Sequence, residues 1–486
     1  MDGLLLRMGL PPPENAKNRL GAPAIWVTVL DSDTLTGSGV QALSWLLAER
    51  HAAVSGLLVS VRDAGEADAA VQLYAYAEAR AHYHRALDSL KHLPDNVSNR
   101  QQQVDISVRL VNVSLQSESP EKNLAILTEA ENMASSLADE ALLARVQLWI
   151  GRVHYLAARL PEAISYFQKV LAVAPKFGDP ELMALPGAVI GRVLILQGQF
   201  AKAHQLLDRT VPLLEATENR HELLFACLYR GVSRALLGDY AAGAAELDQV
   251  LKTAQASRNQ NAETMAHTAL AMIRVVAGKY QEAMGNAQAA LAIAEKSGDT
   301  MFRYSSNSFM GWALTGLGEH QRALEHWSAA HKAARPLGGR LLLGEWLAAI
   351  ESDTLLGAGD IPAALKKGEE ALVIAKAAGS LIAEALSESA IGNALAAGPT
   401  PDYKNAEAHL ARSLSLLESI GAKFDLARVS LALGRVRIER KDWQGASKLL
   451  QQASSLASQC SLQLEAAKAR DLLQEIETAR IQDSAR

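Results

Sequence analysis

The feature that most constrains this chain is a series of small residues spaced about forty positions apart. They recur at intervals of 40 residues from position 151 to 311, and then at intervals of 40 to 42. The members of this first column are Gly151, Gly191, Gly231, Ala271, Gly311, Ser352, Gly392 and Gly434. A period of this length indicates an array of short units that stack on their neighbours, and argues against one globular core.

Three further columns run in phase with the first. The second consists of glycines, the third of bulky and mostly aromatic residues, and the fourth of alanines with one glycine. In order, they are Gly198, Gly238, Gly278, Gly318 and Gly359; Leu160, Phe200, Tyr240, Tyr280, His320, Ile361, Tyr403 and Trp443; and Ala163, Ala203, Gly243, Ala283, Ala323, Ala364, Ala406 and Ala446. A glycine ends a helix readily, and small residues let helices approach closely. The predicted unit is therefore helix, turn, helix, turn.

This order of columns resembles the tetratricopeptide repeat, whose usual period is about 34 residues. The resemblance implies an all-α, right-handed superhelical solenoid of about ten repeats, with helices longer than usual by about a turn or two. We expect the repeats to occupy residues 57–460 and a polar capping helix and tail to occupy 461–486. Residues 1–56, which include the strand-like run AIWVTVL, do not join the pattern, and we assign them no fold.

Composition narrows the class of partner and the compartment. The 486 residues carry a formal net charge of −5, which disfavours the basic face that nucleic-acid binding needs. The two cysteines, Cys227 and Cys460, provide no disulfide framework and fit a reducing compartment. No apolar run approaches the length of a membrane span. We therefore expect a cytoplasmic protein that binds neither nucleic acid nor membrane.

Several strings extend the resemblance beyond a generic repeat. LYAYAEARAHYHRALDSL, SPEKNLAILTEAENMA and ALPGAVIGRVLILQGQFAKAHQLLDRTVPLLE are similar to the C-terminal repeat regions of bacterial signal-transduction ATPases of the AAA or STAND type, and of adenylate or guanylate cyclases with such repeats. That resemblance implies a sensory or regulatory repeat region that follows an upstream ATPase or cyclase module. The chain has no G-x-x-x-x-G-K-[ST] phosphate loop, so no catalytic residue or cofactor transfers from that family. We interpret it as a free-standing relative or as the separated C-terminal part of such a protein.

The residues that suggest metal or catalytic chemistry have simpler explanations. His221 and Glu222 lack the second histidine of a zinc helix, and His82 and His84 point to different faces of one helix. His320 belongs to the aromatic column, where packing explains it. We predict no enzyme, no metal and no cofactor.

The candidate binding residues lie on the first helix of each unit, which lines the concave face in tetratricopeptide folds. In that register the predicted partner-binding residues are Arg145, Arg152, Tyr155, Arg192, Trp312, Trp346, Asp353, Asn393 and Arg435. Arginine and tryptophan are enriched at binding hot spots. The alternative is that the apolar members pack against neighbouring helices and that the arginines are merely solvated. The trio Arg145, Arg152 and Arg192 favours an acidic or carboxylate-bearing partner.

These observations predict a non-enzymatic scaffold or regulatory repeat domain of a bacterial signalling system, which binds a protein or peptide segment in its concave groove. The alternative is a domain that senses a small molecule, detached from a signal-transduction ATPase or cyclase. The sequence does not identify the partner or the oligomeric state.

Overall fold

The computed structural model describes residues 63–68, 76–115, 118–157, 159–217, 219–337 and 343–484. Within these ranges every regular element is a helix, and no strand occurs. The predicted all-α repeat fold is confirmed, whereas the run AIWVTVL and the rest of segment 1–56 lie outside the described residues. The chain divides into two compact units, Met1–Leu142 and Leu143–Arg486, which are described one at a time.

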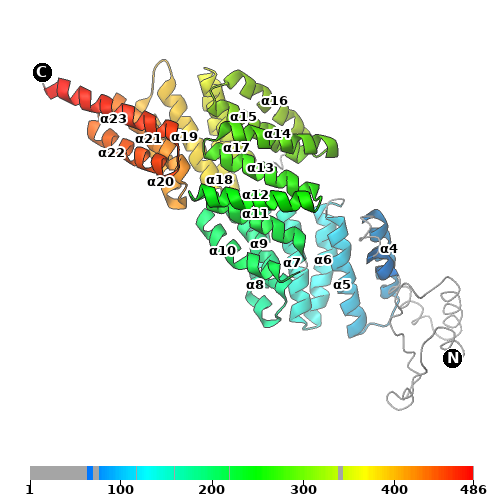
Figure 1. The fold of residues 1–486 in the computed structure, drawn as a ribbon. Coiled ribbons are helices and arrows are strands. Elements are labelled where there is room, and N and C mark those ends of the chain that lie inside the picture. Colours follow the sequence, from blue (N-terminus) through cyan, green and yellow to red (C-terminus); the bar gives the residue numbers. More distant parts are fainter. Residues whose placement is uncertain are drawn as a thin grey trace, which may run out of the picture. The chain divides into compact units, whose positions relative to one another are not determined.

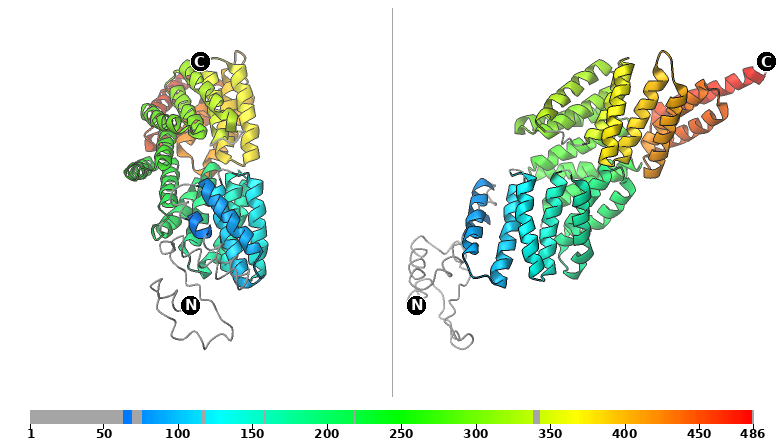
Figure 2. Two further views of the ribbon diagram at one scale, coloured as in Figure 1. Left: turned by 90° about the vertical axis from the view of Figure 1, so that its right-hand side faces the viewer. Right: turned by 180° about the vertical axis from the view of Figure 1, so that it is seen from behind.

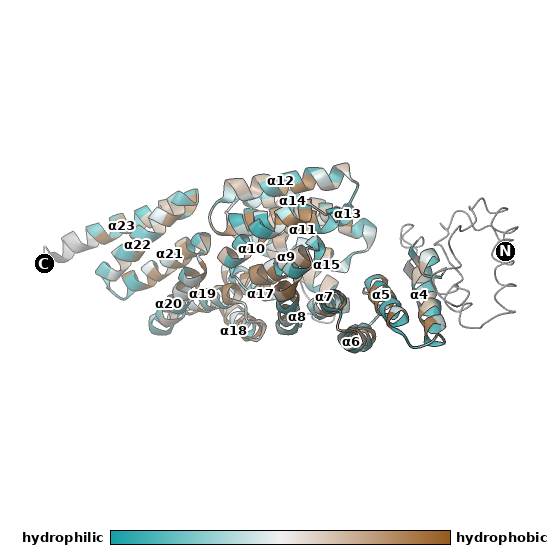
Figure 3. Cartoon of the chain, turned by 90° about the horizontal axis from the view of Figure 1, so that it is seen from below, coloured by the Kyte–Doolittle hydropathy of each residue, from teal (hydrophilic) through white to brown (hydrophobic). Residues whose placement is uncertain are grey.

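The described part of the first unit contains three long helices, α4 (Tyr76–Lys91), α5 (Val97–Ser114) and α6 (Pro120–Ser136). Its core joins Tyr83 and Leu90 of α4 to Ile106 and Leu110 of α5, and all four side chains are buried. Brown and teal bands alternate along α4 and α5 in Figure 3, as expected for amphipathic helices with one buried face.

The second unit is a run of helix pairs that follows the predicted period (Figure 1). The first helices of the pairs are α7 (Glu140–Leu156), α9 (Pro180–Leu196), α11 (Arg220–Leu236), α13 (Gln260–Val276), α15 (Thr300–Gly316), α17 (Gly344–Gly357), α19 (Leu381–Ala397), α21 (Lys423–Glu439) and α23 (Gln463–Ser484). The second helices are α8 (Leu160–Val173), α10 (Phe200–Glu215), α12 (Tyr240–Ala256), α14 (Tyr280–Ser297), α16 (His320–Ala334), α18 (Ile361–Ala378), α20 (Tyr403–Ile420) and α22 (Trp443–Gln459). Short 3₁₀ turns, η2 (Ala174–Lys176) and η3 (Arg335–Leu337), follow α8 and α16.

The turns between helices use the residues that the pattern predicts. The glycines of the second column all have positive φ, for example 105° at Gly238, so each closes its helix in the left-handed conformation. Aspartates begin many of the following helices, as Asp239 does by accepting a hydrogen bond from the Ala242 amide. Local sequence therefore sets where the helices start and stop.

The small-residue columns are explained by close helix packing. A Cβ atom on Gly151 or Gly191 would lie 2.7 Å from the Phe167 or Leu207 side chain of the second helix in the same pair. The alanines of the fourth column, such as Ala163 and Ala203, are fully buried. Each small residue therefore makes room for a large apolar side chain on its partner helix.

The aromatic column packs each pair against the next. A Cβ on Gly316 would lie 2.3 Å from the ring of Tyr280, and a Cβ on Gly357 would lie 2.2 Å from the ring of His320. His320 is therefore a packing residue, as its place in the column predicts.

The first helices form the inner wall of the second unit. Each packs against the first helix of the next pair: α9 against α11, α11 against α13, and so on to α21 against α23. Elements on the inner side of a curved array lie closer together than those on its outer side. Side chains of the first helices that point away from the second helices thus share one inner face.

Pairs five repeats apart meet end to end. The backbone N–H of Leu381, at the start of α19, donates to Gln197 O beyond the end of α9 over 3.1 Å, and Ser380 Oγ donates to Leu196 O over 2.7 Å. Four repeats apart, Arg428 of α21 reaches back to Val276 O at the end of α13 over 2.8 Å. In Figure 2 the green helices meet the yellow and orange ones at this boundary, which we call the seam.

Candidate partner-binding face

Three successive first helices bring opposite charges together on the inner face. Arg152 of α7 donates from Nη2 to Glu222 Oε1 of α11 over 3.1 Å, and Arg192 of α9 donates from Nη2 to Glu222 Oε2. The side chains of Arg152, Arg192 and Glu222 are 24%, 11% and 5% exposed. With Tyr155 and Tyr229, which lie beside them, these residues form what we call the arginine cluster.

Aromatic rings surround the guanidinium groups. Arg152 lies 4.9 Å from the centroid of the Trp149 ring, and Arg192 lies 5.3 Å and 5.4 Å from the rings of Phe225 and Tyr229. Such rings attract a cation through their quadrupole and exclude water from it. The cluster is therefore held in a poorly hydrated environment.

The pKa values of the acidic and phenolic groups in the arginine cluster reflect this poorly hydrated environment. Burial raises the pKa of Glu222, but attraction to Arg192 and Arg152 outweighs it, and the pKa falls to about 2. Burial also raises the pKa of the Tyr155 and Tyr229 hydroxyls, so both remain protonated hydrogen-bond donors. Glu222 is thus held as an anion between two cations.

The arginine cluster carries more positive charge than it neutralises internally. Two guanidinium groups face one carboxylate, which leaves one positive charge in excess. Burial lowers the pKa of the neighbouring His221. Among the described residues, the buried Nε of Arg192 has no hydrogen-bond partner. This arrangement can accept a further anionic or hydrogen-bonding group.

Arg145 does not join the other two arginines. Its Nη2 lies 3.2 Å from Asp179 Oδ2, the cap of α9, and its side chain is 57% exposed. The trio predicted from the register therefore separates into a partly buried pair that shares Glu222 and an exposed arginine with its own partner.

A second polar group, the aspartate cluster, joins the C-terminal halves of α17 and α19 to the N-terminal turns of α21 and α23 beside the seam. It consists of Asp353, Asn393, Asp425, Arg428 and Glu465. Asn393 hydrogen bonds to Asp353, and Arg428 donates to Glu465 over 3.1 Å and to Asp425 over 3.4 Å. Burial raises the pKa of Asp353 to about 7, against the weaker opposing effects of Asn393 and Arg428. The predicted residues Asp353 and Asn393 thus lie together on this face.

The remaining predicted residues differ in exposure. Trp312 is 8% exposed and stacks on Phe309, with ring centroids 6.3 Å apart. Trp346 is 1% exposed, packs edge-on against Phe200, and donates to Leu196 O at the seam over 3.3 Å. Its ring leaves no surface for a partner. Arg435 is exposed, and no ion pair involves it in the described part of the chain.

Glu222 is the residue that the register missed. It lies nine positions before Gly231, near the start of α11, and its partners are 30 and 70 residues away in the sequence. An acidic residue on an otherwise apolar helix face is the signal that sequence reasoning could have used.

The first unit has one group of side chains with metal-ligand character among the described residues, Asp63, Glu66 and His82. The Arg85 guanidinium contacts both Asp63 and His82. Because the positive charge of Arg85 already lies beside these side chains, we interpret them as an ion-pair network. None of the described helices combines the length and the apolar character that crossing a membrane requires.

Comparison with known proteins identifies the fold. No protein-family model matches the sequence, and no curated protein is detectably similar to it. Among solved structures, a Rap protein complexed with competence and sporulation factor aligns at a TM-score of 0.54 and 13% identity, over 78% of this chain and 98% of that one. The Rap conjugation gene regulator of plasmid pLS20, in complex with the Phr* peptide, aligns at 0.49 and 13%, over 75% and 97%.

A STAND protein with a tetratricopeptide repeat sensor, from Pyrococcus horikoshii, aligns at a TM-score of 0.43 and 14% identity, over 83% of this chain and 66% of that one. At 13% identity, the alignment with the Rap protein in complex with competence and sporulation factor shows similarity of fold alone. Together with the repeat geometry, the Rap structure shows that this chain is a helical repeat protein of the tetratricopeptide type.

Proposed function

We propose that the inner face of residues 143–484 binds a segment of another protein or a peptide, and that the chain is a non-enzymatic regulatory or scaffolding protein. The partner places an anionic group, either an acidic side chain or a terminal carboxylate, at the arginine cluster. The aspartate cluster contacts the same segment further along the face through Asp353 and Asn393.

The observation that carries this proposal is the excess positive charge of a buried cluster. Arg192 is only 11% exposed and keeps an unpartnered Nε, although Glu222 already binds two arginines. Charge-assisted hydrogen bonds are worth about 1.5–3 kcal/mol, whereas exposed ion pairs are worth about 0–1 kcal/mol. The poorly hydrated cluster therefore favours an anion more than Arg145 or Arg435 does.

The fold supports this role. First helices that pack side by side present a continuous face on which an extended segment can contact several repeats. The solved Rap protein of similar fold is in complex with competence and sporulation factor. By analogy, we propose that partner binding on this chain regulates a signalling step in the cytoplasm, with an ATPase or cyclase module as a candidate target.

Binding to a display library of short random peptides tests the proposal. We expect enrichment of sequences with an acidic side chain or a free C-terminus. We expect a selected peptide to lose affinity when its carboxylate is replaced by an amide, and the loss should be about tenfold to a hundredfold. Affinity should also fall as salt rises.

Two variants distinguish a specific effect of the arginine cluster on peptide binding from an effect of the protein's net charge. Arg192→Gln leaves Arg152 and Glu222 as a neutral pair and should abolish the preference for the carboxylate over the amide peptide. Lys202→Gln removes the same charge from the outer helix α10 and should keep that preference. If the parent protein selected no peptide, the proposed function would fail. If it selected peptides without acidic groups, only the role of the arginine cluster would fail.

A further inference from the structure

Three helices that begin at the seam carry an apolar side chain at their second position, and one of these side chains is exposed. The second residue of α19 is Ile382 and that of α21 is Phe424, and each is only 2% exposed. The second residue of α23 is Leu464, which is 55% exposed. An apolar side chain thus stands exposed where its equivalents in the two preceding repeats are buried.

Three glycine turns lie opposite the starts of these helices, and only Gly198 meets a second-position residue, Ile382, directly. A Cβ atom on Gly198 would lie 2.9 Å from Ile382, and a Cβ on Gly238 would lie 2.9 Å from Lys423. A Cβ on Gly278 would meet Leu462 at 3.4 Å. At the third turn the contact is therefore made by Leu462, which is 2% exposed and precedes α23, and Leu464 stays outside it.

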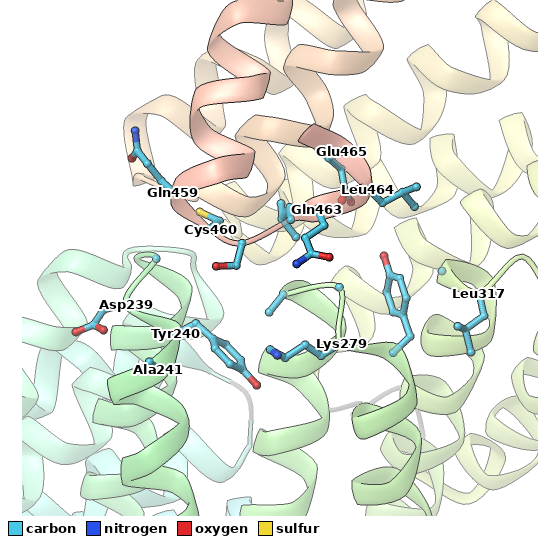
Figure 4. Close-up of a pocket in the computed structure, with 17 residues that line it drawn as sticks. Asp239, Tyr240, Ala241, Lys279, Leu317, Gln459, Cys460, Gln463, Leu464 and Glu465 are labelled. Atoms are coloured by element: carbon cyan, nitrogen blue, oxygen red, sulfur yellow. The ribbon is translucent and has the colours of Figure 1, made fainter. Parts of the chain in front are cut away.

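A cavity of about 920 Å³ lies at the third position. Figure 4 shows that its walls come from the turns before α12 and α14 on one side, and from the turn between α22 and α23 on the other. Gln463 faces Lys279 across the open space, and Leu464 lies at the edge of the cavity. A cavity of roughly 300–1,000 Å³ is the size that holds a small organic ligand.

The lining combines apolar surface with charges that are already compensated. Tyr240, Tyr280, Leu317 and Leu464 supply rings and methyl groups. Of the charged residues, Glu465 binds Arg428 over 3.1 Å, Asp239 lies 3.5 Å from Arg234, and Lys279 lies 3.6 Å from Glu282. An ionic ligand would have to displace these pairs, whereas an uncharged one would not.

We propose that this seam cavity, which meets the aspartate cluster at Glu465 and lies away from the arginine cluster, is a second binding site for an uncharged, ring-bearing small molecule. The ring stacks on the tyrosines and leucines, and its polar edge bonds to Gln463 and the hydroxyl of Ser461. Such a ligand touches two parts of the chain about two hundred residues apart, 238–241 with 277–280 and 459–465. Its binding joins successive turns of the superhelix and regulates how far they separate.

The test uses fluorinated, uncharged aromatic fragments and ¹⁹F NMR, with carboxylate-bearing and amine-bearing analogues as comparisons. We expect saturable binding of uncharged fragments, and at least tenfold weaker binding of both charged sets. Hydrogen exchange should slow at residues 238–241 and 459–465 when a bound fragment saturates the protein.

Gln463→Trp places an indole in the cavity and should weaken fragment binding at least tenfold. Gln474→Trp adds the same ring to an exposed position later in α23 and should leave it unchanged. The proposal is overturned if no uncharged fragment binds, if charged fragments bind as well as uncharged ones, or if both tryptophan variants bind like the parent. Loss of peptide binding at the inner face would not affect this result.

Discussion

Replacing Glu222 by glutamine should destabilise the second unit, because it leaves two partly buried guanidinium groups without their shared anion. The pKa of Glu222 falls from 4.5 to about 2 in the folded protein. Each pKa unit corresponds to about 1.36 kcal/mol, so ionised Glu222 contributes about 3 kcal/mol. Removing one member of a buried ion pair costs about 3–5 kcal/mol in other proteins, which agrees with this value.

The sign of the pH dependence gives a second readout. A carboxyl group whose folded-state pKa is depressed stabilises the protein above its unfolded-state pKa, and this contribution is lost as the pH falls from about 4.5 to 2. Glu222→Gln should therefore lose most stability at neutral pH and approach the parent near pH 2. Urea denaturation, followed by circular dichroism at several pH values, measures both effects.

Arg145→Gln is the matched control for the buried cluster. Its ion pair with Asp179 is largely exposed, so its loss should cost less than about 1 kcal/mol at any pH. Because repeats couple mainly to their neighbours, hydrogen exchange in Glu222→Gln should accelerate chiefly in α7, α9 and α11. A loss in Glu222→Gln no larger than in Arg145→Gln would refute the reasoning.

Three further predictions address other parts of the second unit. Gly243→Ala should lower the free energy of unfolding by about 1–3 kcal/mol, because the new Cβ would lie 2.5 Å from Gly231 O. Gly285→Ala, at an open helical position, should raise it by about 0.5–1 kcal/mol. Thermal denaturation compares the two variants. Because burial holds the pKa of Asp353 at about 7, its ionisation lowers stability as the pH rises from about 4 to 7. Asp353→Asn should therefore match the parent at pH 4 and exceed it by roughly 1–3 kcal/mol at pH 8 in urea denaturation. Calorimetric titration should detect no ATP binding, since the sequence has no phosphate loop.

The fold was predictable because each repeat is specified by local sequence. The positive φ of Gly198 and the burial of Ala163 follow from columns that can be read directly along the chain. The contact between Gly151 and Phe167 lies within one pair, only 16 residues apart. Helix propensity, turn chemistry and the room for close packing all favour the same structure at these positions.

The binding face was only partly predictable. The register placed Arg152 and Arg192 on the inner face, but it did not show that Glu222, from a third helix, lies between them. The sequence pattern placed Trp346 among the residues that line the inner face. It is buried instead, because the end of α9 contacts it at the seam. The contact between Ser380 and Leu196 spans 184 residues and depends on the rotation that accumulates over five repeats. No column of the sequence encodes that rotation.

The central claim is that a partner segment binds to the inner face formed by the first helices. Hydrogen exchange, measured with and without a selected acidic peptide, tests it most directly. We predict slower exchange in α7, α9 and α11 and little change in α8, α10 and α12. Protection confined to the second helices, with none in the first, would place the partner on the outer surface and contradict the account.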